Sequence, residues 1–247
     1  MDVAPQERFT ETVDDYARYR PGYPRALVDW IVATAGLKTG AHIVDVGCGT
    51  GISSRLFAER GFAVTGVDPN DAMLAKAREE GGATYIRGEA TATGLPDHSA
   101  DLVTVAQAFH WLDVPPSLRE FARILIPGGW CCAFWNARAD TPFLAEYDAL
   151  LKRYSTEYER AMGGRKALAR LKEDPSVADL LEATFPNHQV FDWAGLRGRA
   201  WSSSYVVHGV ADASGLEREL RDLFDRFAGS GSVRFDYQTN VYAWRFR

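Results

Sequence analysis

Cysteine is scarce in this sequence: 247 residues contain three, at positions 48, 131 and 132. An odd number of cysteines does not form a complete disulfide framework, and adjacent cysteines on a strand point to opposite faces. The sequence also has no CxxC or HxxxH pair that would supply zinc ligands at a workable spacing, so no metal site is expected. Reduced cysteines favour a cytoplasmic protein.

The signals for a membrane or a nucleic-acid partner are missing as well. No apolar run approaches the roughly 18–20 residues that a transmembrane helix needs. The first eleven residues are polar and acidic, which is not typical of a secretory signal peptide. The formal net charge is −5, whereas binding to a phosphate backbone requires a basic surface. We therefore expect neither a membrane nor a nucleic acid as a partner.

Strands and helices alternate through the first half of the sequence. The expected strands are short apolar runs at 42–46, 62–67, 83–87, 101–107 and 130–135. The expected helices have apolar residues at helical spacing and lie at 24–36, 52–60, 70–80 and 113–125. This alternation predicts an α/β fold, a Rossmann-like doubly wound sheet that is mostly parallel, with helices on both faces.

The second half has a different pattern. Helices are expected at 141–172, with a break near Gly163, at 176–185 and at 214–228; strands are expected at 189–193 and 233–246. The late strands predict an antiparallel C-terminal edge on the sheet. We predict a single domain over 1–247, with an N-terminal cap (about 1–36), a core (about 37–136), a helical insertion (about 141–186) and C-terminal strands (about 187–247).

Four aromatic residues recur at about helical spacing within 141–158: Phe143, Tyr147, Tyr154 and Tyr158. A stripe of this kind usually faces the core, and a substrate-binding lid is the alternative.

The segment Asp45–Gly51 carries three glycines, Gly47, Gly49 and Gly51, between the first expected strand and the next helix. Glycines there allow a tight turn and a close approach of a ligand to the backbone, at the edge where parallel sheets bind ligands. A dinucleotide fingerprint would place its third glycine where Ile52 stands. Asp45 would repel a pyrophosphate and suits a cationic ligand such as S-adenosylmethionine (SAM), which has a sulfonium and an ammonium group.

An acidic residue stands about twenty positions beyond this loop, at the end of the second expected strand. Asp68 is placed to accept hydrogen bonds from both hydroxyls of a ribose; the alternative is that it caps the following helix. Asn70 and Met73 would line the adenine side, although Met73 also suits core packing. Glu89 and Ala90, after the third strand, could meet the adenine ring, unless Glu89 is only a solvated loop acid.

Four motifs together resemble the class I SAM-dependent methyltransferases. They are Asp-Val-Gly-Cys-Gly-Thr-Gly at 45–51, Gly-Val-Asp-Pro-Asn at 66–70, Gly-Leu-Pro-Asp at 94–97 and Arg-Ile-Leu-Ile-Pro-Gly-Gly at 123–129. Within this family, Tyr-Arg-Pro-Gly-Tyr-Pro at 19–24 and Gln-Ala-Phe-His-Trp-Leu-Asp at 107–113 are similar to the trans-aconitate methyltransferase relatives, which methylate small molecules. The resemblance covers about residues 9–136.

The resemblance implies a set of cofactor-binding residues. The three loop glycines would cradle the methionine part of SAM, with Gln107 beside its amino acid end and Asp68 on the ribose. Arg20 would pair with the SAM carboxylate if the N-terminal segment folds over the site; the alternative is a solvated arginine in a turn. The remaining members are neighbours on the same loops: Asp45, Cys48, Pro69, Asn70, Met73, Glu89 and Ala90.

His110 is the candidate catalytic residue. It lies three residues beyond Gln107, and a histidine there could remove the proton of a hydroxyl acceptor or contact the substrate; structural packing is the alternative. A carboxylate acceptor needs no base. The leading hypothesis is methyl transfer from SAM to an oxygen, carboxylate or hydroxyl, of a small-molecule acceptor. N- or C-methylation and a non-catalytic SAM-binding module remain open, and no oligomeric state is predicted.

Overall fold

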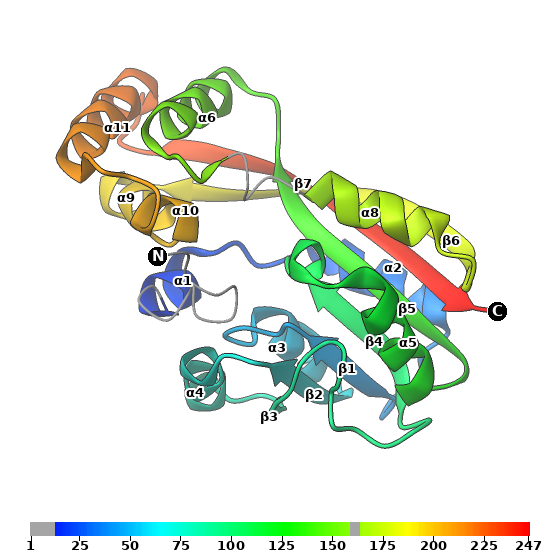
Figure 1. Ribbon diagram of the computed structural model, residues 1–247. Coiled ribbons are helices and arrows are strands. Elements are labelled where there is room, and N and C mark those ends of the chain that lie inside the picture. Colours follow the sequence, from blue (N-terminus) through cyan, green and yellow to red (C-terminus); the bar gives the residue numbers. More distant parts are fainter. Residues whose placement is uncertain (1–12, 159–163) are drawn as a thin grey trace.

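The computed structural model describes residues 13–158 and 164–247 and contains a seven-stranded sheet (Figure 1). The strand order is β3-β2-β1-β4-β5-β7-β6. The strands are β1 (His42–Val46), β2 (Ala63–Asp68), β3 (Thr84–Arg87), β4 (Ala100–Ala106), β5 (Leu125–Arg138), β6 (Val177–Phe191) and β7 (Val233–Phe246). β1 to β5 pair in parallel, and β7 pairs antiparallel with both β5 and β6. The mostly parallel sheet with an antiparallel C-terminal edge is thus confirmed.

Helices cover both faces of this sheet. Those of the first half are α2 (Arg25–Ala35), α3 (Ile52–Ala58), α4 (Asp71–Glu80) and α5 (Val114–Ile124), and α8 (Gly164–Glu173) follows later. Leu27, Ile31 and Phe57 bring α2 and α3 into one core cluster with Ile43 of β1. Phe121 of α5 belongs to the cluster on the other face, which also holds α8 side chains. Because both faces are buried, the central strands β1 and β4 are mostly apolar and do not alternate regularly with polar residues.

The expected elements of the first half are all present, with ends within a few residues of the prediction. β5 is longer than expected and continues to Arg138. The helix expected at 176–185 is wrong, because those residues lie in β6. β6 pairs with β7 along most of its length, from Val177↔Phe246 to Phe191↔Val233. The pairing with β7 overrides the helix propensity of Ala, Leu and Glu in this stretch.

A second lobe stands where β6 and β7 extend beyond the parallel strands (Figure 1). Its helices are α6 (Pro142–Tyr154), α9 (Trp193–Trp201), α10 (Ser204–Val207) and α11 (Ala213–Phe227). They share a buried cluster with Phe235 and Tyr237 of β7. Phe143 and Tyr147 of α6 pack their rings against Phe235, with centroids 6.1 and 5.1 Å apart, so the aromatic stripe is core. The expected break near Gly163 lies outside the described residues.

The short helix α1 (Val13–Tyr19) connects the two parts. It packs against α9 of the second lobe and also against α4 of the core, and Figure 1 shows it beneath α9 and α10. The expected N-terminal cap therefore comes close to the loops that follow β1 and β2.

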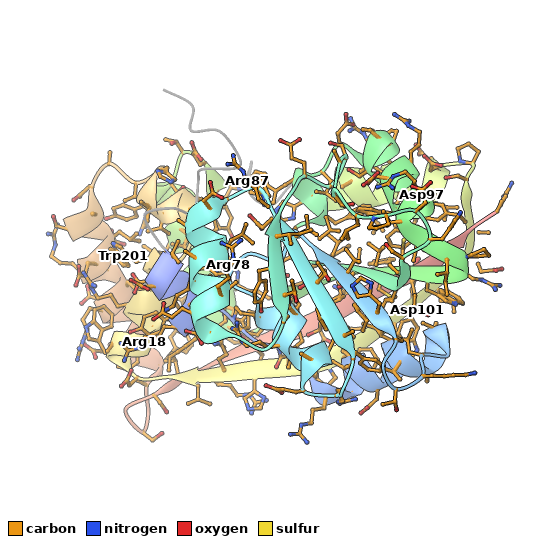
Figure 2. The ribbon with its side chains drawn as sticks, turned by 90° about the horizontal axis from the view of Figure 1, so that it is seen from below. Arg18, Arg78, Arg87, Asp97, Asp101 and Trp201 are labelled. Carbon is orange, nitrogen blue, oxygen red and sulfur yellow. The ribbon has the colours of Figure 1, made fainter. Side chains whose placement is uncertain are left out.

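From below, α4 and the β3 edge face the reader (Figure 2). Arg78 of α4 donates a hydrogen bond to the Tyr85 carbonyl of β3 at 3.1 Å, which connects this helix to the edge strand of the sheet. Within 13–158 and 164–247 no helix is both long and apolar enough to span a bilayer. The three cysteines are unpaired and buried.

Candidate active site

Three hollows meet at Gln107, the residue that follows β4. The first has a volume of about 330 Å³ and lies over the glycine loop; we call it the glycine-loop cavity. The second, of about 480 Å³, lies between the core and the second lobe and is called the arginine cavity. A narrow passage of about 20 Å³ adjoins them, lined by Tyr16, Arg20 and Gly47. Gln107 lines all three.

Gln107 is held at this junction in an unusual backbone conformation. Its φ is 56°, in the left-handed region that non-glycine residues seldom adopt. Its backbone N–H donates to the Phe134 carbonyl at 2.9 Å, and its side-chain Oε1 accepts from the Asn136 N–H at 2.6 Å. Two contacts to β5 thus stabilise a strained residue where the cavities meet.

The glycine loop forms the floor of the first cavity. The N–H groups of Gly47 and Cys48 both donate to the Val67 carbonyl, which ties the loop to the end of β2. Gly47 has a φ of 69°, and a Cβ there would lie 2.6 Å from the Ala108 Cβ. Gly49 has a φ of 55°, and a Cβ there would meet no protein atom within 4 Å. The loop therefore needs glycine for its turn and presents open space above Gly49.

Asp45 lies behind this loop and does not line the cavities. Its side chain is fully buried and accepts from the hydroxyls of Ser53 and Ser54, each at 2.6 Å, and from Thr104 at 3.0 Å. Burial raises the pKa of this carboxyl, and the three hydroxyl donors oppose that rise. The expectation that Asp45 contacts the ligand is therefore corrected: all its observed contacts anchor the loop to α3 and β4.

Asp68 occupies the wall of the glycine-loop cavity at the end of β2. Its Oδ2 accepts from the Gly49 N–H and its Oδ1 from the Asn70 N–H, both at 2.9 Å. Each carboxylate oxygen can accept a further hydrogen bond. Burial raises the pKa of Asp68 despite these bonds, and the nearby Asp45 adds to the rise. The N-cap of α4 is Asn70, whose side chain accepts from Met73 N–H at 3.0 Å, so Asp68 is not the helix cap.

Most other predicted cofactor residues also lie around this cavity. The lining includes Gly47, Gly49, Pro69, Asn70, Met73, Glu89, Ala90 and Gln107. Met73 lines the cavity and is only 3% exposed, so it can pack in the core and contact a ligand at the same time. Cys48 lines only the passage, and Gly51 lines none of the three spaces. A Cβ at Gly51 would overlap the Tyr85 hydroxyl, so this glycine serves the packing of the loop on β3.

The arginine cavity has an excess of positive charge. Arg20, Arg138 and Arg199 line it, and Asp148 is the carboxylate among its described lining residues. Arg138 Nε lies 2.7 Å from Asp148 Oδ1, which balances one guanidinium group. Two positive charges therefore have no carboxylate partner on the described wall. Buried charges of this kind are costly unless a counter-ion joins them.

Arg20 reaches this cavity from the chain just after α1. Its Nη2 donates to the Ser202 carbonyl at 3.1 Å, and its guanidinium stacks on the Tyr16 ring with 4.8 Å to the centroid. The Nε is buried and has no hydrogen-bond partner. Burial and the charge of Arg199 lower the pKa of Arg20. Arg20 lines both the passage and the arginine cavity.

Arg138 and Arg199 are site residues that sequence reasoning missed. Arg138 ends β5, three residues beyond the predicted strand end, and its Nη2 donates to the Tyr158 hydroxyl at 3.1 Å. Arg199 lies on α9, which the sequence pattern did not reveal, and its Nε donates to the Tyr237 hydroxyl at 3.2 Å. Arg199 is 5% exposed. The sequence signal that could have identified Arg199 is its position in the stretch Trp193–Trp201, where an arginine stands among small and apolar residues.

His110 lines the arginine cavity, on a turn of 3-10 helix (Phe109–Trp111) directly after Gln107. Its ring centroid lies 4.8 Å from that of Trp111. Burial, together with the positive charge of Arg20, lowers the pKa of His110 to about 4. The imidazole is therefore neutral at neutral pH.

Comparison with known proteins agrees with this geometry. A family model described as a methyltransferase domain matches residues 44–133. An uncharacterized methyltransferase of Mycobacterium tuberculosis is 39% identical over 131 residues, covering 53% of this chain and 52% of that protein. The malonyl-[acyl-carrier protein] O-methyltransferase of Serratia marcescens is 38% identical over 92 residues, 36% of each chain. These matches span about half, or less, of the length of the curated relatives.

A solved structure matches nearly the whole chain. The structure of a proposed type II methyltransferase from Anaeromyxobacter dehalogenans has a TM-score of 0.74 and 28% identity, covering 92% of this chain and 98% of that one. The matched methyltransferase domain and the cavity over the glycine loop agree with the resemblance of this chain to the class I SAM-dependent methyltransferases. The finer likeness to the trans-aconitate relatives stays a prediction.

Proposed function

We propose that the protein transfers a methyl group from SAM to an oxygen of a small organic acid. The observation that carries this proposal is the position of Gln107, which lines both the glycine-loop cavity and a cavity with two unbalanced arginine charges. A donor in the first cavity and an anionic acceptor in the second would have their reacting ends at the same residue. Proximity of this kind supplies much of the rate of a methyl transfer.

The residues of the glycine-loop cavity fit SAM. Gly47 and Gly49 leave room for its methionine part, Asp68 would accept from its ribose hydroxyls, and Glu89 with Ala90 would face its adenine. When bound, SAM supplies a methyl group that a sulfonium makes electrophilic. The carboxylates of Asp68 and, behind the loop, Asp45 give this end a negative potential, which suits that cation.

The arginine cavity fits an acid. Guanidinium groups bind carboxylates through paired, charge-assisted hydrogen bonds, and Arg20 and Arg199 have no carboxylate partner on the described wall of this cavity. A carboxylate oxygen is already a nucleophile at neutral pH, so no proton has to be removed. The name of the Serratia relative, an O-methyltransferase, supports transfer to oxygen.

A hydroxyl acceptor is the second candidate, because His110 lies in the same cavity and is neutral. If His110 is a base, activity should fall only as the pH drops toward about 4, where the histidine gains its proton, and not near pH 6.5. His110→Ala should then lower kcat by about 10²–10⁴-fold. With an acid acceptor we expect the variant to raise KM and leave kcat within a few-fold. Pre-steady-state rates across pH 4–8 separate the two results.

A SAM-consumption assay on a metabolite library tests the proposed function. We expect turnover with small organic acids and none with the matching amides or neutral alcohols. Methyl esters among the products, found by mass spectrometry, would establish the oxygen as acceptor. N- or C-methylated products would contradict the oxygen assignment. Tight SAM binding without turnover on any acceptor would indicate a non-catalytic SAM-binding module.

A further inference from the structure

Tyr205, on α10, places its phenol oxygen among the guanidinium groups of the arginine cavity. The residue is 5% exposed. Its oxygen accepts from Arg138 Nη1 at 3.4 Å. The Ser203 oxygen accepts from Arg199 Nη1 at 3.1 Å. The Arg138 guanidinium, which donates to the Tyr205 oxygen, stabilises its ionised form.

The other groups around Tyr205 do not provide this negative charge. Its ring packs edge-on against Tyr158, with centroids 5.4 Å apart. Burial raises the pKa of Tyr147 and of Tyr158. Tyr237 donates its proton to Gln189 Oε1 at 2.9 Å. The remaining charged or titratable neighbours in the cavity are Arg20, Arg138, Arg199, Asp148, His110 and Tyr242.

Tyr205 differs from these phenols in the balance of its surroundings. Burial alone would raise its pKa, but the positive charges of Arg138, Arg199 and Arg20 outweigh burial and bring the pKa to about 8. The Tyr205 oxygen lies where the cavity has more guanidinium than carboxylate groups. Its ionised form would supply the negative charge that the described wall otherwise lacks.

We propose that Tyr205 is an internal counter-ion of the arginine cavity in alkaline solution, where its phenolate takes up a proton from solvent when an anionic acceptor enters. The proposal rests on the proposed function for the identity of that anion. One O–H bond forms on Tyr205, the proton comes from water or buffer, and no other bond changes. The acceptor then replaces the phenolate as the partner of the guanidinium groups.

The same exchange favours release of the product. Methylation of a carboxylate removes its negative charge, so the arginines lose the ligand that had replaced the phenolate. Tyr205 can then return its proton to solvent and restore the counter-ion. Binding of the uncharged ester needs no proton on Tyr205, whereas binding of the acid weakens as the pH rises above about 8. The preference of the cavity for the acid over its ester should therefore decrease at alkaline pH.

The tyrosinate absorption band tests the first half of this proposal directly. Titration of the wild-type protein from pH 6 to 10 should show one phenol ionising near pH 8, and Tyr205→Phe should remove it. Tyr242→Phe is the matched control, because Tyr242 lines the same cavity and burial raises the pKa of its phenol. This variant should keep the transition near pH 8.

Calorimetry with succinate, a small dicarboxylate, tests the exchange. At pH 8, in buffers of different ionisation enthalpy, the wild type should take up about 0.5 proton per succinate, and Tyr205→Phe none. Above pH 8 the wild-type Kd should rise about tenfold per pH unit, whereas the Kd of Tyr205→Phe should stay nearly constant. At pH 9.5 the variant should therefore bind about 30-fold more tightly than the wild type. A merely structural role would make the variant bind more weakly.

The possible results are distinct. The absence of a Tyr205-dependent transition below pH 9 would overturn the counter-ion, whether or not the proposed function holds. Succinate binding without proton uptake would overturn the exchange. A normal titration of Tyr205 together with no binding of succinate or of inorganic phosphate would instead overturn the anionic acceptor of the proposed function, and the exchange with it.

Discussion

Replacing Arg199 by methionine is expected to raise the KM of an acid acceptor about 10²–10³-fold, because a buried, charge-assisted contact is lost. Methionine keeps much of the length and apolar volume of the arginine stem. Tyr237 and Ser203 each lose a donor in this variant, so thermal unfolding must be measured beside the kinetics. The Kd for SAM should change less than about twofold, since Arg199 lies outside the glycine-loop cavity.

Arg197→Met is the matched control on the same helix. Arg197 points away from the cavity, is 45% exposed and pairs with Glu217 at 2.7 Å. Exposed ion pairs contribute little, so this variant should keep the acceptor KM within about twofold. An equal rise of KM in both variants, or none in Arg199→Met, would show that the arginine cavity is not the acceptor site.

Replacing Asp68 by alanine is expected to weaken SAM binding about 10–150-fold, because the ribose hydroxyls lose a charged acceptor. The N–H groups of Gly49 and Asn70 also lose their acceptor, so part of the effect comes from a looser glycine loop. Calorimetric titration with SAM and with S-adenosylhomocysteine measures the loss. Asp68→Asn, which keeps one oxygen, should fall between wild type and alanine.

Asp71→Ala is the matched control for the Asp68→Ala substitution. Asp71 stands three residues later, is 68% exposed and pairs with Arg87 across the surface at 3.0 Å. Arg87 is labelled in Figure 2, at the outer edge beside α4. We expect the SAM affinity of the Asp71→Ala variant to stay within about twofold of the wild-type value. SAM affinity that is unaltered in a folded Asp68→Ala protein would remove Asp68 from the cofactor site.

The glycine-loop cavity was largely predictable from the sequence because each of its parts is local. A glycine turn between a buried strand and a helix is recognisable within seven residues, and Asp68 follows at the end of the next strand. Asp45 shows where this reasoning was wrong. Its place beside the glycines suggested a ligand contact, whereas three hydroxyls from α3 and β4 occupy its carboxylate. A motif identifies the loop and does not say which way each side chain points.

The C-terminal half was less predictable for a related reason. The stretch 176–185 contains good helix formers, and only its long antiparallel pairing with β7 makes it a strand. That pairing carries the second lobe and the two short helices α9 and α10, which supply Arg199 and Tyr205. The error in this one strand therefore hid the contribution of Arg199 and Tyr205 to the arginine cavity.

The sequence by itself determined the parallel half of the sheet, the glycine loop and the acidic residue at the end of β2. Their periodicity and spacing reflect contacts between neighbours in the chain. Only the tertiary structure decided the arginine cavity. Arg20 donates to a carbonyl 182 positions away, and Arg138 to a hydroxyl 67 positions away. Charges so far apart in sequence leave no periodic pattern, and their excess becomes visible only where the packing of α1, β5 and α9 buries them in one space.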